Sequence, residues 1–305
     1  MGKKKTPNKH KKNRFRWIWP LTIILFLLAT LAVAVHTIFL KPGISPTSNN
    51  LTRKEPLTST PQHQKNHQIG KLKPQNNKKA IKHQPEPENR LAIIIDDMGE
   101  DFKIGSALID LNLPLSFSFL PFASHNENLL QAAAQQKRDI LLHLPMEPEN
   151  GDWDPGRGAL YTAMSPARIK MTIAANLAEV PSAIGVNNHM GSGFTADRRS
   201  MSTCLSFLKQ RDLFFIDSLT SNRSLGFSLA RNKGLKTAKR DIFLDNKKNV
   251  EEIKKNISSL IEIARKHGQS IGIGHPYPET LEALRQSREA LRQNVKVVGI
   301  HDLVE

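Results

Sequence analysis

Short apolar runs alternate with longer amphipathic stretches from Leu91 to the end of the chain. Eight runs have the length and composition of buried strands and cover residues 91–96, 113–122, 139–146, 183–189, 213–218, 241–245, 270–276 and 295–302. Five stretches carry apolar residues three and four positions apart, as helices do, and cover residues 126–137, 165–180, 200–211, 249–268 and 278–293. Strands that alternate with helices form parallel βαβ units whose sheet is covered on both faces. We therefore expect residues 90–305 to fold as one α/β domain, either barrel-like or doubly wound.

A basic segment and a long apolar run precede this domain. Residues 1–16 contain eight Lys or Arg and no acid, and residues 17–40 form a run of mainly apolar side chains. In a helix this run spans about 36 Å, which exceeds a hydrocarbon core of about 30 Å, so it predicts a transmembrane helix. We expect the run to stay uncleaved as an anchor, and the alternative is a signal peptide cut after the A-x-A sequence at 32–34.

The basic segment also predicts orientation and location. The positive-inside rule places residues 1–16 in the cytoplasm as a basic tail, and everything after Lys41 on the other side of the membrane. Residues 41–89 are rich in Pro, Asn, Gln and Lys and poor in large apolar residues, which predicts a disordered linker. We expect a single-pass inner-membrane protein whose folded domain lies on the periplasmic or extracytoplasmic side.

The positive charge of the chain belongs to its N-terminal part. The formal net charge is +16, but residues 1–90 hold 18 Lys and Arg against 3 acids, while the remaining residues hold 26 against 25. The folded domain is thus close to neutral, which argues against a nucleic-acid partner. Cys204 is the single cysteine of the chain, which excludes an internal disulfide and a cysteine-based zinc site.

Polar side chains with potential ligand atoms follow one predicted strand after another. They are Asp96, Asp97, His143, Asn187, Asn188, His189, Asp217, Asp245, His275, His301 and Asp302. Because the C-terminal ends of parallel strands share one face of the fold, we expect a site there. Histidine and carboxylate side chains together bind divalent metals, zinc above all. The sequence has no G-x-S-x-G elbow, P-loop or G-x-G-x-x-G, the signatures of serine hydrolases, NTPases and dinucleotide-binding enzymes.

Two adjacent aspartates end the first predicted strand. Asp97 is the natural metal ligand and Asp96 a general base, whereas the structural alternative is a cap on the following helix. Successive side chains of a strand point to opposite faces, so we expect the two carboxylates to occupy different environments.

The later strand ends differ in how strongly they indicate chemistry. His143 lies between leucines, which favours a core histidine, whereas His189 lies in the polar stretch VNNHMGSGF, which favours a site. His275 precedes two prolines that stiffen its loop, which suits a general acid as well as a structural turn. Asp217 either orients a histidine or caps a helix, and His301 lies near the C-terminus, where a site role is less expected.

Five motifs in this order are similar to those of a known family. They are IIIDDMG at 93–99, LLHLPMEP at 141–148, VNNHMGSGFT at 186–195, FFIDSLTS at 214–221 and GIGHPYPETLEAL at 272–284. Over residues 90–305 the chain resembles the divergent polysaccharide deacetylase family, which is related to NodB-type carbohydrate esterases. The resemblance implies a distorted (β/α) barrel of about seven strands and metal-dependent removal of N- or O-acetyl groups from a glycan.

The resemblance also implies roles for individual residues. It makes Asp96 the catalytic base, Asp97 a metal ligand and His275 the catalytic acid. We group Asp217 with these catalytic residues, as a partner that orients a histidine.

The expected metal ligands depart from the pattern of the related enzymes. Those deacetylases bind their metal through an H-x-x-x-H pair, whereas here the second position is Glu147. We therefore expect a mixed carboxylate and histidine ligand set, Asp97, His143 and His189, around a divalent metal, with zinc as the first candidate. The residues expected to contact substrate are Asn187, Asn188, Ser192 and Glu147.

Two functions follow from these observations. The first is hydrolysis of acetyl groups on an envelope polysaccharide or peptidoglycan-like glycan, by a protein held at the membrane through its N-terminal helix. The alternative is a catalytically inactive glycan- or protein-binding module of the cell envelope, which the missing H-x-x-x-H pair favours.

Overall fold

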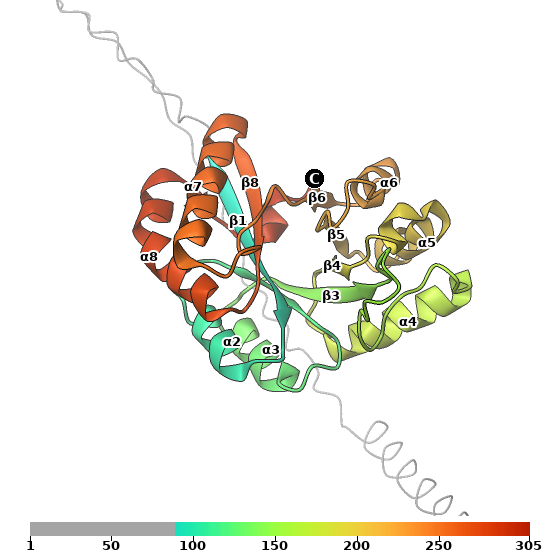
Figure 1. The fold of residues 1–305 in the computed structure, drawn as a ribbon. Helices are drawn as coiled ribbons and strands as arrows, with labels where there is room; N and C mark the ends of the chain where they lie inside the picture. The colour runs from blue at the N-terminus through green and yellow to red at the C-terminus, as the bar shows by residue number, and fades with distance from the viewer. Residues whose placement is uncertain (1–88) are drawn as a thin grey trace, which may run out of the picture. The chain divides into compact units, whose positions relative to one another are not determined.

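A curved sheet of parallel strands organises the computed structural model, which describes residues 89–305 (Figure 1). The sheet runs in the order β6-β5-β4-β3-β2-β1-β8-β7, with β9 paired to the start of β1. The strands are β1 (Arg90–Met98), β2 (Ser116–Phe119), β3 (Ile140–Met146), β4 (Gly185–Met190), β5 (Phe214–Asp217), β6 (Thr237–Lys239), β7 (Ile242–Phe243), β8 (Gln269–Gly274) and β9 (Lys296–Val297).

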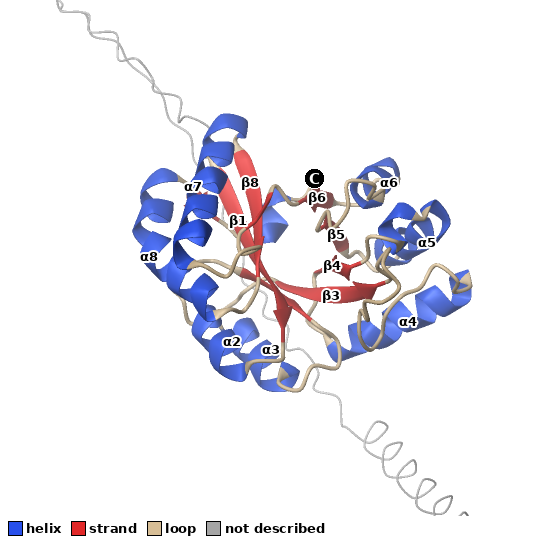
Figure 2. Ribbon diagram, in the orientation of Figure 1, coloured by secondary structure: helices blue, strands red, loops and turns tan. Residues whose placement is uncertain are grey.

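Helices cover the convex side of this sheet (Figure 2). They are α2 (Phe102–Ile109), α3 (Asn126–Gln135), α4 (Pro166–Glu179), α5 (Arg198–Lys209), α6 (Gly226–Asn232), α7 (Val250–His267) and α8 (Pro278–Asn294), with 3-10 turns η1 (Phe194–Ala196) and η2 (Ile300–Leu303). Helix α7 shows why such segments form. The Asn249 side chain accepts hydrogen bonds from two backbone N–H groups of its first turn, and Gly268 ends it in the left-handed conformation.

The α/β prediction is confirmed, and the distorted barrel expected from the resemblance is an incomplete one. The described residues form nine strands rather than about seven, and β6 and β7 are the two edges of an open half-barrel. None of the helices within residues 89–305 is long and apolar enough to cross a membrane. The predicted tail at 1–16, anchor at 17–40 and nearly all of the linker at 41–89 lie outside the described residues.

The two faces of the sheet belong to different apolar clusters. Along β1, Leu91, Ile93 and Ile95 pack with the helices, while Ala92 and Ile94 face the concave side. The concave cluster holds strand residues and three residues of the C-terminal segment, Val298, Ile300 and Leu303. The alternation of strand side chains thus produces an outer and an inner core.

The C-terminal segment crosses the N-terminal end of the half-barrel. The Val298 N–H donates to the Leu91 carbonyl, the Ile300 N–H to Ser116 Oγ and the His301 N–H to Asp139 Oδ2. At the far edge Thr237 N donates to the Glu305 carbonyl at 3.0 Å. One end of the half-barrel is therefore covered, and the predicted site lies at the other.

Candidate metal centre

Asp96 and Asp97 both point into the same cluster, so the expectation of different environments is wrong. The pairing of β1 with β2 changes register between Ile95 and Met98, and Asp97 has a left-handed backbone with φ of 53°. Asp96 Oδ2 lies 3.6 Å from His143 Nε2, and Asp97 Oδ1 lies 3.2 Å from the same nitrogen. Asp96 is buried, with 2% of its surface exposed, whereas Asp97 is partly open to the pocket.

Three ligand atoms, carried by side chains of β1, β3 and β4, form a small triangle. Asp97 Oδ1 lies 2.9 Å from His189 Nδ1 and 3.2 Å from His143 Nε2, and the two nitrogens are 3.1 Å apart. Tetrahedral ligands about 2.0–2.1 Å from zinc are about 3.3 Å apart, so the triangle has the size of one face of a zinc site. Asp97 Oδ1 is buried without a hydrogen-bond partner among the described residues. The oxygen and the two nitrogens therefore fit a shared divalent cation better than they fit one another.

Asn187 holds the base and one metal ligand in place from behind. Its Nδ2 donates to Asp96 Oδ1 at 2.7 Å, while its Oδ1 accepts from Ser118 Oγ at 2.5 Å and from His143 Nδ1 at 2.8 Å. Because an amide oxygen only accepts, His143 Nδ1 carries a proton, and Nε2 is the ring nitrogen that faces the cluster and can bind a metal once it is deprotonated. Asn187, expected to contact substrate, is fully buried and does not line the pocket.

A second histidine–carboxylate pair faces the triangle. His275 Nδ1 donates to Asp245 Oδ1 at 2.8 Å, and the other oxygen of Asp245 accepts from His275 N and Thr280 Oγ1. His275 Nε2 therefore points toward the cluster, 4.0 Å from Asp97 Oδ2. The sequence placed Asp245 at a strand end, but nothing in the sequence paired it with His275, 30 residues later.

Burial and neighbouring charges shift the acid–base properties of these groups. Burial raises the pKa of Asp96 above its usual value, which the charges of His143 and His275 only partly oppose. Burial also raises the pKa of Asp97, but the contacts with His143 and His189 outweigh it and hold that pKa well below its usual range. For His143, burial is outweighed by Asp96 and Asp97, which raise its pKa to about 9. Burial lowers the pKa of His275, but Asp245 together with the charges of Asp96 and Asp97 outweighs it and raises that pKa.

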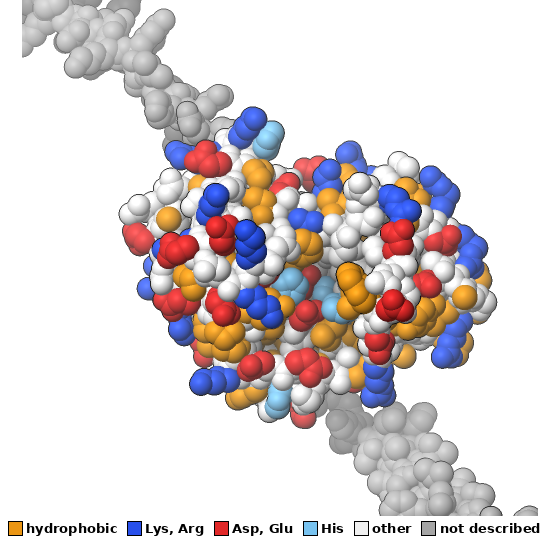
Figure 3. Space-filling model, viewed as in Figure 1, with side chains coloured by type: hydrophobic (Ala, Val, Ile, Leu, Met, Phe, Trp, Pro, Cys, Tyr) orange, Lys and Arg blue, Asp and Glu red, His pale blue; other side chains and the backbone are white. Residues whose placement is uncertain are grey.

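The cluster lines an open pocket of about 220 Å³ at the C-terminal ends of the strands. Figure 3 shows histidine side chains at the bottom of this hollow. Asn188 and Ser192, expected to contact substrate, lie in its wall together with Trp153, which is 60% exposed. The arrangement is a metal-sized triangle with a buried carboxylate on one side and a carboxylate-held histidine on the other.

The remaining predicted residues lie elsewhere. Asp217 Oδ2 accepts from Ser224 Oγ and Phe227 N, so its carboxylate faces the start of α6. Glu147 Oε2 accepts from Thr162 N, and neither carboxylate lines the pocket. His301 contacts Asp139 at the opposite end of the half-barrel, as expected for a residue outside the site.

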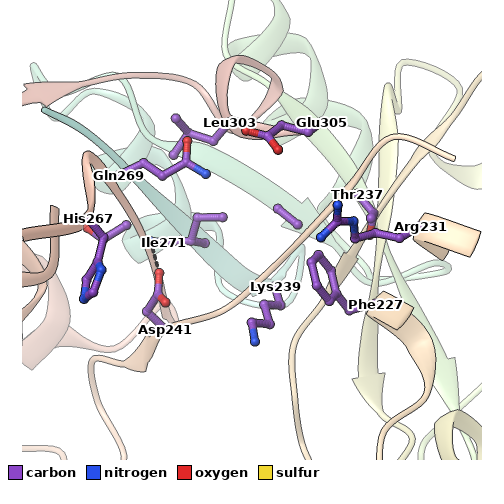
Figure 4. Close-up of a pocket in the computed structure, with 12 residues that line it drawn as sticks. Phe227, Arg231, Thr237, Lys239, Asp241, His267, Gln269, Ile271, Leu303 and Glu305 are labelled. Atoms are coloured by element: carbon purple, nitrogen blue, oxygen red, sulfur yellow. Dashed lines mark hydrogen bonds between the residues drawn. The ribbon is translucent and has the colours of Figure 1, made fainter. Parts of the chain in front are cut away.

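A different cavity, of about 280 Å³, lies where the sheet stays open between β6 and β8 (Figure 4). Phe227 and Arg231 of α6 face it from one side, and Asp241 faces it from the other, where its carboxylate accepts from Ile271 N at 2.8 Å. The cavity adjoins the start of β8, whereas His275 follows the end of that strand. It contains none of the residues of the metal cluster.

Comparisons with known proteins agree with this fold. The chain is 35% identical over 218 residues to an uncharacterised protein of Haemophilus influenzae, covering 71% of this chain and 77% of that protein. It is 31% identical over 215 residues to YibQ of Escherichia coli K12, covering 70% of this chain and 67% of that protein. An uncharacterised protein of Agrobacterium tumefaciens C58, known from its crystal structure, shares a TM-score of 0.68 and 25% identity, covering 71% of this chain and 89% of that one.

The family follows from a match that spans the folded part of the chain. Residues 93–304 match the sequence pattern of divergent polysaccharide deacetylases, from the first strand to the end of η2. This protein therefore belongs to the divergent polysaccharide deacetylase family.

Proposed function

We propose that this protein removes acetyl groups from an envelope polysaccharide or peptidoglycan-like glycan. A divalent metal, with zinc as the first candidate, would bind at Asp97, His143 and His189. The triangle of ligand atoms, 2.9–3.2 Å on its edges, carries the proposal. It lies in an open pocket and is flanked by a buried carboxylate and a histidine, the two groups that acyl hydrolysis requires. Family membership supports the reaction class.

The metal, when bound, supplies polarisation of the acyl carbonyl and a lower pKa for a water molecule. Asp96 accepts the proton that this water loses when its oxygen bonds to the acyl carbon. The raised pKa of Asp96 makes it a stronger base than an exposed aspartate. Asn187, donating to Asp96 Oδ1, leaves Oδ2 on the side of His143 and the pocket.

His275 completes the hydrolysis by protonating the leaving group. The acyl C–N or C–O bond breaks, the sugar nitrogen or oxygen takes the proton from His275 Nε2, and acetate is released. Asp245 keeps the Nδ1 proton in place and raises the pKa of His275, so the imidazolium needed for this step persists to higher pH than in a free histidine.

The proposal includes a location. The apolar run at 17–40, with eight basic residues before it, supports a single-pass anchor in the inner membrane. The domain would then work on the periplasmic or extracytoplasmic side, where envelope glycans are found.

Metal content and acetate release test this function together. Full-length protein, purified in detergent without a metal-binding tag, should contain near-stoichiometric zinc by mass spectrometry. Asp97→Ala and His189→Ala should lose the metal, whereas Asp96→Asn should keep it and lose acetate release by about 100-fold or more. Asp302→Asn changes an exposed carboxylate at the opposite end of the half-barrel and should match the wild type in both measurements.

A catalytically inactive glycan- or protein-binding module is the alternative. The absence of an H-x-x-x-H pair favours it. Against it, His143 of β3 and His189 of β4 converge without such a pair, because the two strands are neighbours in the sheet with His143 opposite Asn187. Protein that stays metal-free under added zinc and releases no acetate would support the alternative.

A further inference from the structure

The sequence HPYP at 275–278 forms a tight turn between β8 and α8. Tyr277 N donates to the His275 carbonyl at 2.8 Å, which closes a three-residue turn with Pro276 at its centre. Proline suits this position because its ring fixes φ, and Pro278 keeps the preceding Tyr277 extended, with φ of −95° and ψ of 148°. Tyr277 occupies the N-cap position of α8, yet its side chain makes no capping hydrogen bond. Helix capping therefore does not explain the tyrosine at this place.

The turn lays the Tyr277 ring against the imidazole of His275. The two rings are stacked, with their centres 5.6 Å apart and their planes at 27°. Phe243, at the end of β7, stacks on the same imidazole, with ring centres 6.1 Å apart and planes at 24°. Both geometries fall within the range of offset stacking between aromatic rings. Two rings from different elements thus contact the proposed catalytic acid.

Each of these two rings carries a cation. The Arg240 guanidinium carbon lies 3.7 Å from the centre of the Phe243 ring, and Lys248 Nζ lies 3.7 Å from the centre of the Tyr277 ring. The Arg240 guanidinium is itself fixed, because it donates to two backbone carbonyls of the loop that follows β5, at 2.7 and 2.9 Å. Contacts other than those with the imidazole therefore hold both rings in place.

The imidazole of His275 needs such support. Its hydrogen bond from Nδ1 to Asp245 is the only one that the ring makes within residues 89–305. One bond restrains the ring plane weakly, because the χ2 torsion of an aromatic side chain is broad. Proton transfer requires Nε2 within hydrogen-bond reach of the leaving atom. Rocking of the ring would carry the proton away from that atom.

We propose that Tyr277 and Phe243 are positioning residues, which hold the ring plane of His275 so that Nε2 stays directed at the leaving atom; the inference rests on the proposed function. Tyr277 does not line the pocket at the metal cluster, so it acts on the reaction through His275. Its hydroxyl group has no hydrogen-bond partner within the described residues, so the aromatic ring is the part that acts.

Substrates whose leaving groups differ in their need for a proton test this role. A sugar amine leaves only with a proton from an acid, whereas the phenolate of para-nitrophenyl acetate leaves as a stable anion. In full-length, zinc-loaded protein, Tyr277→Leu should lower kcat about tenfold or more on a tetramer of N-acetylglucosamine, with KM unchanged. It should leave kcat on the aryl ester unchanged, and Tyr277→Phe should keep the wild-type values on both substrates. The matched control, Tyr161→Leu, removes a ring that is 38% exposed and lies outside the pocket, and it should change neither value.

The mobility of the imidazole gives a readout that does not depend on activity. In full-length protein with isotope-labelled histidine, nuclear magnetic relaxation of the His275 ring gives an order parameter, and the signal is assigned by its loss in His275→Gln. We expect this order parameter to fall in Tyr277→Leu and to keep its wild-type value in Tyr277→Phe. Phe243→Leu should lower it as well, which preserves the test if Tyr277→Leu does not fold.

Three outcomes overturn the inference when the wild type is active. Wild-type kcat on the tetramer in Tyr277→Leu would mean that the ring is not needed, and equal falls on both substrates would mean that the variant disturbs the metal centre. An equal fall in Tyr277→Phe would mean that the hydroxyl group acts rather than the ring. If the wild type releases acetate from neither compound, the proposed function fails, and the order parameter decides separately whether these rings hold His275. A lower value in Tyr277→Leu supports that, while an unchanged value overturns it.

Discussion

At the scale of single residues, Asn187 links the two halves of the proposed mechanism. One amide donates to Asp96 and accepts from His143 and Ser118, so Asn187→Leu would remove a hydrogen-bond partner from three buried polar groups. We expect the free energy of unfolding to fall by about 1–3 kcal/mol and zinc affinity to fall by about tenfold or more. Denaturant unfolding and zinc titration measure the two effects.

Ser118→Ala is the matched control for that prediction. It removes one hydrogen bond to Asn187 Oδ1 and leaves the contacts with Asp96 and His143. Its effect on zinc affinity should be much smaller. Wild-type zinc affinity in Asn187→Leu would show that His143 is positioned without this amide.

The pKa of His143 sets the sign of the pH dependence of metal binding. Burial lowers this pKa, but Asp96 and Asp97 outweigh it and raise the pKa to about 9 in the metal-free protein. At neutral pH both ring nitrogens therefore carry protons, and the Nε2 proton must leave before zinc binds. We expect zinc affinity to rise with pH up to about 9, with a proton released to the buffer. Affinity that stays constant from about pH 6 to pH 9 would contradict this.

The residue types of the site could be predicted from the sequence, but their geometry could not. Strand-end positions placed Asp97, His143 and His189 among eleven candidates, and the resemblance to the deacetylase family singled out these three, which the structure brings together. Alternation along a strand placed Asp96 and Asp97 apart, because that rule assumes extended backbone and Asp97 is left-handed. The partnership of Asp245 with His275 depends on the pairing of β7 and β8, which no local pattern reveals.

At the scale of elements, the length of a helix or strand decided whether the sequence could predict it. The predicted helices at 249–268 and 278–293 agree closely with α7 and α8, since each repeats its apolar spacing over several turns. Helices α2 and α6, of eight and seven residues, were missed because two turns give little periodicity. The run at 295–302 was expected as a strand, yet only Lys296–Val297 pair with β1, and Val298 and Ile300 pack inside the half-barrel.

The end of α3 offers a direct test of how a helix stops. Lys137 follows the C-terminal cap of α3 with φ of 54°, and its side chain is exposed. Lys137→Gly removes the Cβ that disfavours this conformation, so we expect the free energy of unfolding to rise by about 1 kcal/mol. Lys170→Gly, at an exposed position inside α4, should lower it by about 1 kcal/mol. Equal losses in both variants would contradict the strain assigned to Lys137.

At the scale of the whole molecule, the half-barrel has one covered and one open end. The C-terminal segment covers the N-terminal ends of the strands, whereas the pocket with its metal cluster opens at their C-terminal ends. Stability and chemistry are thus separated along the axis of the strands, as in barrel enzymes that act at their C-terminal face. Changes in the C-terminal segment should therefore affect folding without altering the site.

Ile300 allows this separation to be measured. Its side chain is 0% exposed and packs in the concave cluster with residues of β1 and β8. We expect Ile300→Ala to lower the free energy of unfolding by about 2–5 kcal/mol, while the folded fraction keeps its zinc content. Ile184→Ala removes the same atoms from a side chain that is 41% exposed, so it should cost clearly less. Denaturant unfolding compares the two variants. Equal losses of unfolding free energy would mean that the C-terminal segment does not close the inner core. Loss of zinc from folded Ile300→Ala would mean that the two ends of the half-barrel are coupled.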